Sequence, residues 1–259
     1  MTHERYTHGH HETVLRSHSW RTVDNSAAYL APHLGPGVRV LDVGCGPGTI
    51  SADMVERGCD VIGVDAAADV VAKARELGVD ARVGDAYALD FDDDSFDVVH
   101  AHQTLQHLAR PVEALREFRR VVKPGGVVAV RDCDYAGTIV HPDPNGGIAA
   151  WAALYQQVHR SNGGEPDAGR RLKAWALEAG FADVTATASL WTFTEPEDRV
   201  WWGGMWRDRV LQSAFADDAI GKGFATRDEL EAISRAWAAW ITDEAGFWAM
   251  PHGEILARG

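Results

Sequence analysis

The chain has 259 residues, of which 46% are hydrophobic and 24% charged, and its formal net charge is −13. This composition is that of a folded globular protein and excludes a disordered or collagen-like chain. Because acidic residues prevail and Lys and Arg form no cluster, the charge argues against a protein that binds nucleic acid. The apolar runs are too short to span a membrane and the first residues do not resemble a signal sequence, so we expect no membrane partner and a cytoplasmic location.

The segment from residue 38 to residue 193 alternates short apolar runs with helical patterns. This alternation is typical of βα units and predicts a parallel sheet covered by helices. In chain order, we expect strands at residues 38–43, 59–64, 80–83, 96–101, 127–132 and 182–190, and helices at residues 49–57, 67–77, 111–122 and 166–179.

An insertion and the two ends of the chain lie outside this alternation. Residues 194–245 are predicted to form a helical insertion that caps the core, with a capping box from Thr226 to Glu229. We expect residues 246–259 to add the final strand of the core sheet and residues 1–37 to form an N-terminal helical lid. The chain is thus predicted to be one α/β domain with a helical cap.

The most informative stretch follows the first expected strand and reads Leu41-Asp42-Val43-Gly44-Cys45-Gly46-Pro47-Gly48. Glycines let the backbone turn sharply and let a ligand lie against main-chain atoms near a helix N-terminus. A dinucleotide fingerprint would need its third glycine where Thr49 stands, and a P-loop would need a lysine that is absent. An acidic residue beside the loop favours a cationic sulfonium or ammonium over pyrophosphate. An NAD(P)-dependent oxidoreductase is therefore the weaker alternative.

This stretch resembles the first motif of class I S-adenosylmethionine-dependent methyltransferases. Later segments match that family in order and spacing, namely Asp65 at the end of the second strand, Gly84-Asp85-Ala86, Phe96 to Leu108, and Leu115 to Gly126. The likeness is strongest to the small-molecule methyltransferases of ubiquinone and menaquinone biosynthesis. It implies a Rossmann-like class I methyltransferase fold, with a seven-stranded, mostly parallel sheet whose last strand is reversed, helices on both faces and a helical cap.

The resemblance also implies S-adenosyl-L-methionine as the cofactor and S-adenosyl-L-homocysteine as the product. It places the glycine loop against the cofactor, an acidic strand end at the ribose, a third segment at the adenine, and the end of the fourth strand at the methionine part. The residues concerned are, in that order, Asp42, Gly44 and Gly46; Asp65 and Ala66; Asp85 and Ala86; and His102 and Gln103.

Two histidines are candidates for catalysis on the acceptor side. His107 is the candidate general base because an imidazole titrates near neutral pH, and a packing or helix-capping role is its alternative. His141, in the Pro-rich loop after the fifth strand, is the second candidate. The segment after the fourth expected strand, which contains His107, lacks the Asn- or Asp-Pro-Pro-Tyr/Phe motif of enzymes that methylate nucleobase amino groups. This absence disfavours nucleic-acid substrates.

The first residues include the stretch Tyr6-Thr7-His8-Gly9-His10-His11. Closely spaced imidazoles suit zinc or nickel, but neither cysteines nor a regular histidine spacing complete a site, so we predict no metal. We expect this segment to form a lid over the cofactor instead, from which Tyr6, His10 or Arg21 reaches the cofactor. Arg21 would bind the cofactor's carboxylate by charge complementarity.

Seven of the ten tryptophans lie between Trp191 and Trp248. An aromatic roof over a hydrophobic or aromatic acceptor uses such residues, and packing within a core or a dimer contact is the alternative. We therefore expect transfer of a methyl group from S-adenosylmethionine to a small hydrophobic or aromatic molecule, on oxygen before carbon or nitrogen, by a monomer or homodimer. A non-catalytic S-adenosylmethionine-binding protein is the alternative.

Overall fold

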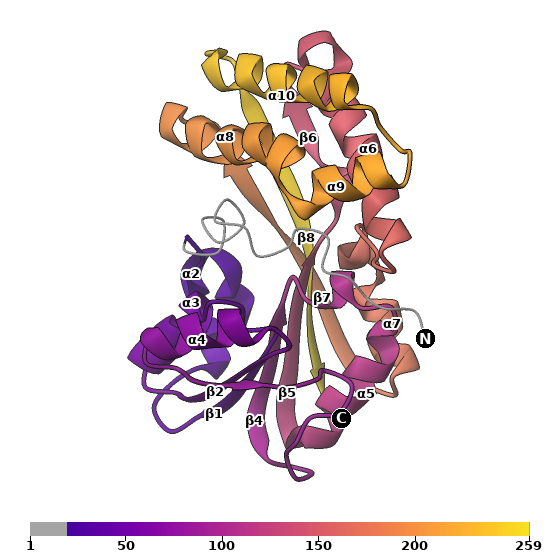
Figure 1. Ribbon diagram of the computed structural model, residues 1–259. Coiled ribbons are helices and arrows are strands. Elements are labelled where there is room, and N and C mark those ends of the chain that lie inside the picture. Colours follow the sequence, from indigo (N-terminus) through magenta and orange to yellow (C-terminus); the bar gives the residue numbers. More distant parts are fainter. Residues whose placement is uncertain (1–19, 259) are drawn as a thin grey trace.

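The structure is a computed structural model that describes residues 20 to 258, and one mixed sheet forms its centre (Figure 1). Five neighbouring strands of this sheet run parallel to one another. In their order across the sheet they are β3 (Asp80–Val83), β2 (Asp60–Asp65), β1 (Arg39–Val43), β4 (Phe96–His102) and β5 (Val122–Cys133). The expected βα alternation and the mostly parallel sheet are confirmed.

The remaining strands are antiparallel to their neighbours and extend the sheet. The last strand, β8 (Phe247–Arg258), is reversed relative to β5, and β7 (Asp183–Phe193) pairs with β8 along nearly its whole length. A short strand, β6 (Ile139–His141), pairs with residues 247–249 of β8. The sheet therefore has eight strands and the expectation of seven was wrong, because β8 continues past the end of β5 and β6 pairs with the part that β5 leaves open.

Helices cover both faces of the parallel part, as the alternating side chains of β1 show. Val40 packs in a cluster with α3 (Thr49–Glu56) on one face, whereas Leu41 and Val43 pack in a cluster with α5 (Pro111–Val121) on the other. Such alternation follows from the two-residue period of a strand, and it leaves the strands buried on both sides.

The described end of the expected N-terminal lid packs against α3. Helix α2 (Val23–Ser26) and the 3₁₀ helix η1 (Ala28–His33) bury Val23 and Leu30 in the cluster that α3 shares with the sheet. The backbone N–H of Val23 donates to the carboxylate of Asp53 at 2.6 Å. This hydrogen bond joins the start of α2 to α3.

The other connections are helices and single turns. They are α4 (Ala68–Glu76), η2 (Leu105–His107), η3 (Tyr135–Gly137), η4 (Pro144–Gly146), η5 (Ala168–Arg171) and α7 (Leu172–Glu178). Within the described residues, no helix is long and apolar enough to cross a membrane.

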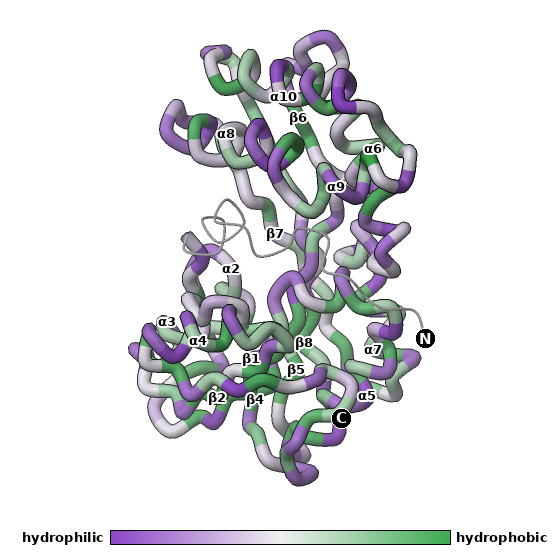
Figure 2. The backbone as a smooth tube through the Cα atoms, in the orientation of Figure 1, coloured by the Kyte–Doolittle hydropathy of each residue, from purple (hydrophilic) through white to green (hydrophobic). Residues whose placement is uncertain are grey.

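Four helices gather at the far end of the long strands β7 and β8 and form the cap (Figure 1). They are α6 (Gly147–Ser161), α8 (Pro196–Gln212), α9 (Ala214–Gly221) and α10 (Arg227–Thr242). The expected capping box begins α10, since Thr226 accepts from the backbone of Glu229 and the Glu229 side chain accepts from Thr226 in return. Hydrophobic and hydrophilic residues alternate along these helices, as expected of helices with one buried face (Figure 2).

The cap has a hydrophobic cluster of its own, separate from the three clusters around the parallel strands. Its fully buried members include Trp151 of α6, Trp206 of α8 and Trp237 of α10, together with Trp248 of β8. The cap therefore draws on α6 as well as on the expected insertion, and the aromatic side chains of its helices pack on the upper ends of β7 and β8.

Candidate active site

A cavity of about 430 Å³ lies between the carboxyl ends of the parallel strands and cap helix α8. Val43 ends β1, Asp65 ends β2 and His102 ends β4, and each lines the cavity. Trp202 and Trp206 of α8 line it from the cap. Carboxyl ends of parallel strands are where α/β proteins bind ligands, and the volume suits a small-molecule site.

Most of the residues expected to bind the cofactor meet in this one cavity, although they come from distant parts of the chain. Those that line it are Arg21, Gly44, Gly46, Asp65, Ala66, Asp85, Ala86, His102 and Gln103, and His107 lines it as well. His141 lies on β6 and is exposed, and it does not line the cavity. Tyr6 and His10 lie outside the described residues.

The glycine loop after β1 is held in place by Asp65. The carboxylate of Asp65 accepts a hydrogen bond from the backbone N–H of Gly46 at 3.0 Å and another from that of Ala67 at 3.0 Å. Gly44 has a φ of +73°, and a Cβ there would lie 2.3 Å from the Thr104 hydroxyl oxygen. Only glycine fits this turn, which lets the main chain face the cavity.

Asp42 lies beneath the loop and outside the main cavity. Its side chain is buried, accepts a hydrogen bond from the Ser51 hydroxyl at 2.5 Å and lies 2.8 Å from Nδ1 of His100. It borders a much smaller side pocket together with Arg21 and His102. Both carboxylate oxygens are thus engaged by buried residues of α3 and β4.

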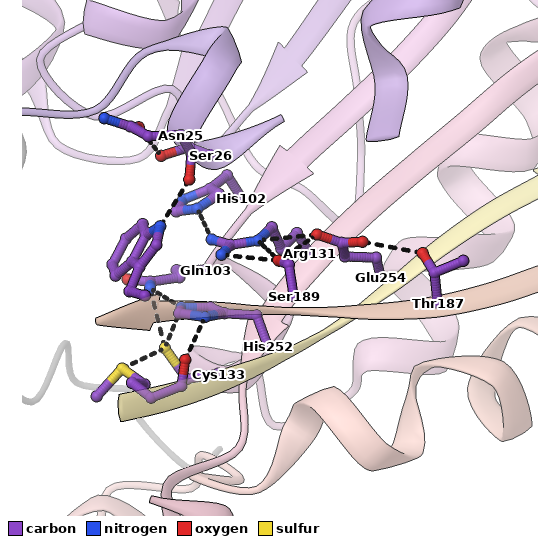
Figure 3. A network of polar contacts seen from close by, with 12 residues as sticks. Asn25, Ser26, His102, Gln103, Arg131, Cys133, Thr187, Ser189, His252 and Glu254 are labelled. Atoms are coloured by element: carbon purple, nitrogen blue, oxygen red, sulfur yellow. Dashed lines mark hydrogen bonds and ion pairs between the residues drawn. The ribbon is translucent and has the colours of Figure 1, made fainter. Parts of the chain in front are cut away.

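His102 belongs to a buried network with Arg131 and Glu254 (Figure 3). Nη1 of Arg131 lies 2.9 Å from Nε2 of His102, and Nε of Arg131 lies 3.2 Å from the carboxylate of Glu254. A guanidinium can only donate, so Nε2 of His102 accepts from Arg131, while Nδ1 of His102 lies 3.5 Å from Nη1 of Arg21. Burial and the nearby charges of Arg21 and Arg131 hold the pKa of His102 well below its usual range.

Gln103 is fixed by partners on both sides of its amide. Its oxygen accepts from Nη2 of Arg21 at 2.7 Å, and its Nε2 lies 2.9 Å from Nε2 of His252 and 2.9 Å from the sulfur of Cys133. Its φ of +51° is uncommon for a residue other than glycine and persists where the surroundings enforce it. The side chain thereby links Arg21 to the sheet at the edge of the cavity.

Gln106 determines how His107 can act. The backbone N–H of Cys133 donates to Oε1 of Gln106 at 3.2 Å, which turns Nε2 of Gln106 toward Nε2 of His107 at 3.0 Å. The amide N–H donates, so Nε2 of His107 accepts. Burial, and next the neighbouring His159, hold the pKa of His107 well below its usual range, so the ring is neutral with its proton on Nδ1. This arrangement argues against the expected role of a general base.

The cap side of the cavity is aromatic, with one buried cation. The tryptophans that line it are Trp191, Trp201, Trp202 and Trp206, whereas Trp237, Trp240 and Trp248 pack inside the cap. The tryptophans thus divide into a set that lines the cavity and a set that packs inside the cap, as the second interpretation predicts for the latter. The buried guanidinium of Arg209 lies 4.8 Å from the centre of the Trp206 ring and also lines the cavity.

Sequence reasoning missed Arg209, although a signal for it exists. Trp202, Met205, Trp206 and Arg209 are spaced at three, four and seven residues, which places them on one helix face. An arginine on the apolar face of a helix is a candidate binding residue, because charged side chains are seldom fully buried unless paired. Arg131 escaped notice because its partner, Glu254, is remote in sequence.

The arrangement fits S-adenosylmethionine by the chemistry of its donors and acceptors. Asp65 and Asp85 offer carboxylates at neighbouring strand ends, the glycine loop offers main-chain atoms, and Arg21 offers a guanidinium. These groups suit the hydroxyls, amine and carboxylate of such a molecule. In the described part of the chain, no three His, Cys, Asp or Glu side chains are grouped as metal ligands.

Comparison with known proteins agrees with this geometry. A family model described as "Methyltransferase domain" matches residues 41–130. An uncharacterized methyltransferase of Schizosaccharomyces pombe is 34% identical over 274 aligned residues, covering 98% of this chain and 96% of that protein. A demethylmenaquinone methyltransferase of Clavibacter sepedonicus is 32% identical over 64% of this chain and 72% of its own length.

Solved structures share the fold at low sequence identity. A phosphoethanolamine N-methyltransferase of Haemonchus contortus, solved with S-adenosyl-L-methionine, aligns with a TM-score of 0.53 at 20% identity, covering 91% of this chain and 52% of that one. The likeness shows the Rossmann-like methyltransferase fold. Together with a relative that matches along nearly the whole chain, it confirms the family that the glycine loop and the later motifs predict. The chain belongs to the class I S-adenosylmethionine-dependent methyltransferases.

Proposed function

We propose that this methyltransferase transfers the methyl group to an oxygen of a small hydrophobic or aromatic molecule bound beneath α8. The observation that supports the proposal most directly is that the cofactor-binding strand ends and four tryptophan side chains line one continuous cavity. Aromatic walls of this kind bury flat apolar molecules. The net charge of −13 argues against nucleic acid as the acceptor.

On the cofactor side, we assign the contacts by chemistry. Asp65 accepts from the ribose hydroxyls, Asp85 and Ala86 face the adenine, and Arg21 pairs with the carboxylate of the methionine part. His102, whose Nδ1 lies 3.5 Å from Nη1 of Arg21, and Gln103 lie beside Arg21. Asp42 is hydrogen-bonded within the core and does not line the main cavity, and His141 takes no part because it lies outside the cavity.

S-adenosylmethionine, when bound, supplies an electrophilic methyl group on a positively charged sulfur. The chain holds the acceptor in line with that methyl group and excludes water, which contributes roughly 7–11 kcal/mol in favourable cases. Trp191 of β7 and Trp202 of α8 close the cavity from the cap, and Met250 of β8 adds apolar surface. Gln106 and His107 lie on the η2 turn that borders the same space.

The proposal is tested by incubating the purified full-length chain with methyl-labelled S-adenosylmethionine and a panel of phenols, quinols, amines and keto acids. Mass spectrometry should find the label on the oxygen of an aromatic acceptor. Asp65→Ala should lower the signal several-fold at cofactor concentrations near the dissociation constant of the wild type. A label found on carbon or nitrogen alone would contradict the assignment of the acceptor atom.

A further inference from the structure

Gln103 has a backbone conformation that a residue with a Cβ seldom adopts. It directly follows β4, it lines the cavity, and its φ of +51° lies in the left-handed region. A residue other than glycine is strained there and keeps such a conformation only where its surroundings hold it. The structure must therefore contain a contact that holds Gln103 at the edge of the cavity.

The amide of the Gln103 side chain is held from both ends. Its oxygen accepts from Nη2 of Arg21 at 2.7 Å, and a guanidinium can only donate, so the amide cannot be turned over. Its nitrogen therefore faces the sheet, where Nε2 of His252 on β8 and the sulfur of Cys133 on β5 each lie 2.9 Å away (Figure 3). The two N–H groups of the amide thus meet two acceptors.

His252 can accept from Gln103 because its other ring nitrogen donates. The ring is fully buried, and its Nδ1 lies 3.1 Å from the carbonyl oxygen of Met250 in the same strand. A carbonyl only accepts, so Nδ1 carries the hydrogen. Burial, and next the charges of Arg131 and Arg21, hold the pKa of His252 well below its usual range, so the ring is neutral. Nε2 therefore presents its lone pair to the amide of Gln103.

The two groups at the ends of this chain of hydrogen bonds determine its polarity. The carbonyl of Met250 only accepts and the guanidinium of Arg21 only donates, so one arrangement satisfies the ring and the amide between them. Reversal of either would place two donors or two acceptors face to face. His252 does not line the cavity, whereas Gln103 does, so an effect of His252 on a ligand must pass through Gln103.

We propose that His252 is a positioning residue for S-adenosylmethionine, because its Nε2 holds Gln103 in the left-handed conformation that shapes the cavity at the end of β4. Without this acceptor, one N–H of the buried amide lacks a partner, and residue 103 relaxes to a negative φ. The main chain between β4 and η2 then leaves the place at which it borders the cofactor. This inference goes beyond the proposed transfer to oxygen and holds whichever acceptor is methylated.

The test is a double-mutant cycle on the full-length chain, with S-adenosylhomocysteine as the probe and calorimetry as the measurement. His252→Phe keeps a buried ring but removes the acceptor, and should weaken binding about two- to ten-fold, the range for loss of one hydrogen bond. Gln103→Gly adopts a φ of +51° without strain, so it no longer has to be held. Added to Gln103→Gly, His252→Phe should cause no further loss of affinity.

Two further measurements do not require a substitution of the buried ring. Gln103→Ala and Gln103→Gly both lack the amide, but only alanine retains a Cβ. The glycine variant should therefore bind S-adenosylhomocysteine at least about three-fold more tightly than the alanine variant. In the wild type, nitrogen-15 NMR should find the ring of His252 neutral and protonated on Nδ1.

Two variants of β8 serve as controls. His252→Gln keeps an acceptor oxygen for the amide of Gln103 and should retain most of the affinity, which separates loss of the acceptor from loss of the ring. Ile255→Val changes the packing of another buried residue of the same strand and should bind as the wild type does. Circular dichroism verifies that each variant is folded, and His252→Gln also assigns the imidazole signal.

Equal losses of affinity from His252→Phe in the wild type and in Gln103→Gly would assign His252 a packing role and overturn the inference. A ring of His252 that is protonated on Nε2 in the wild type overturns it as well. If His252→Phe does not fold, this tautomer and the comparison of glycine with alanine at position 103 decide. The failure of the proposed function is distinguishable, since a chain that passes these tests but methylates only carbon or nitrogen keeps the role of His252 and loses the oxygen acceptor.

Discussion

The amide of Gln106 lies 3.0 Å from Nε2 of His107 and donates to it. In Gln106→Glu, one carboxylate oxygen still accepts from Cys133 while the other now accepts from the ring. The proton of the neutral ring should then move from Nδ1 to Nε2, because a carboxylate only accepts. Nitrogen-15 NMR of the imidazoles, assigned with His107→Gln, measures this change of tautomer. An Nδ1–H ring in both proteins would show that Gln106 does not control His107.

Asp65 is predicted to matter twice, as a ligand of the cofactor and as a support of the glycine loop. Asp65→Ala removes the proposed ribose contact and leaves the N–H groups of Gly46 and Ala67 without their acceptor. We expect the affinity for S-adenosylhomocysteine to fall at least about ten-fold in calorimetry, as for loss of a charged hydrogen bond.

Asp60 provides the matched control for this change. It is the exposed first residue of the same strand, β2, at the end remote from the cavity. Asp60→Ala should bind as the wild type does. Equal affinity of Asp65→Ala and Asp60→Ala would refute the role given to Asp65.

The local part of the architecture could be predicted from the sequence because its signals lie within one or two elements. The turn at Gly44 follows directly from β1, and the strand ends that carry Asp65 and Asp85 follow from the βα alternation. Parallel strands bring such ends to one edge of the sheet. The order of motifs therefore predicted which strand ends meet at the cavity.

The rest depends on contacts that no local pattern contains. Arg131 meets Glu254 across 123 residues of chain, and Gln103 meets His252 across 149. β6 forms where β8 extends beyond the end of β5, and the relative lengths of these strands are set in the folded sheet. His141 is exposed on β6 and lies outside the cavity. The sequence placed it in a loop after the fifth strand, and a loop position does not reveal on which side of the folded chain the residue lies.

The buried ion pair of Arg131 and Glu254 should be costly to break from one side. Glu254 also accepts from Ser189 at 2.5 Å and from Thr187 at 2.9 Å, so Glu254→Gln loses charge and leaves Arg131 uncompensated. We expect a loss of about 3–5 kcal/mol in the free energy of unfolding measured with urea.

Strands β7 and β8 carry a matched, exposed ion pair between Asp183 and Arg258 at 3.5 Å. Asp183→Asn should change the free energy of unfolding by less than about 1 kcal/mol, as surface pairs do. Comparable losses in Glu254→Gln and Asp183→Asn would mean that burial of the Arg131 pair does not govern its contribution.

Acid should unfold the protein partly through His159. Burial lowers the pKa of His159 to about 4, whereas a histidine of the unfolded chain has a pKa of about 6.5. Between these two pH values, only the unfolded state binds a proton at this residue. Stability from this group is complete above about pH 6.5 and is lost as the pH falls, by about 1.4 kcal/mol per pH unit. His159→Gln should flatten the dependence of unfolding free energy on pH between pH 6.5 and 5 by that slope. Exposed His141→Gln should leave the slope unchanged, and an unchanged slope in both would contradict the assignment.

Asp132 acts in the opposite direction. Burial raises its pKa to about 8, and one of its oxygens has no hydrogen-bond partner among residues 20–258, so the folded protein retains a proton that the unfolded chain releases above about pH 4. The stability contributed by this group is complete below about pH 4 and is lost as the pH rises toward 8. The amide in Asp132→Asn cannot titrate, so this variant lacks the loss of stability that the wild type shows as the pH rises. The difference in unfolding free energy between variant and wild type should therefore increase in favour of the variant by about 1.4 kcal/mol per pH unit between pH 5 and pH 8.

The diagnostic quantity for Asp132→Asn is the slope and not the absolute stability. The new amide N–H₂ is buried beside Gln106, whose backbone N–H donates to the other oxygen of Asp132 at 3.2 Å, and any cost of burying it is independent of pH. Asp92→Asn, which changes an exposed carboxylate before β4, should run parallel to the wild type at every pH. If Asp132→Asn also runs parallel, the carboxyl of Asp132 is ionised in the folded protein and the alkaline loss of stability must arise from other groups.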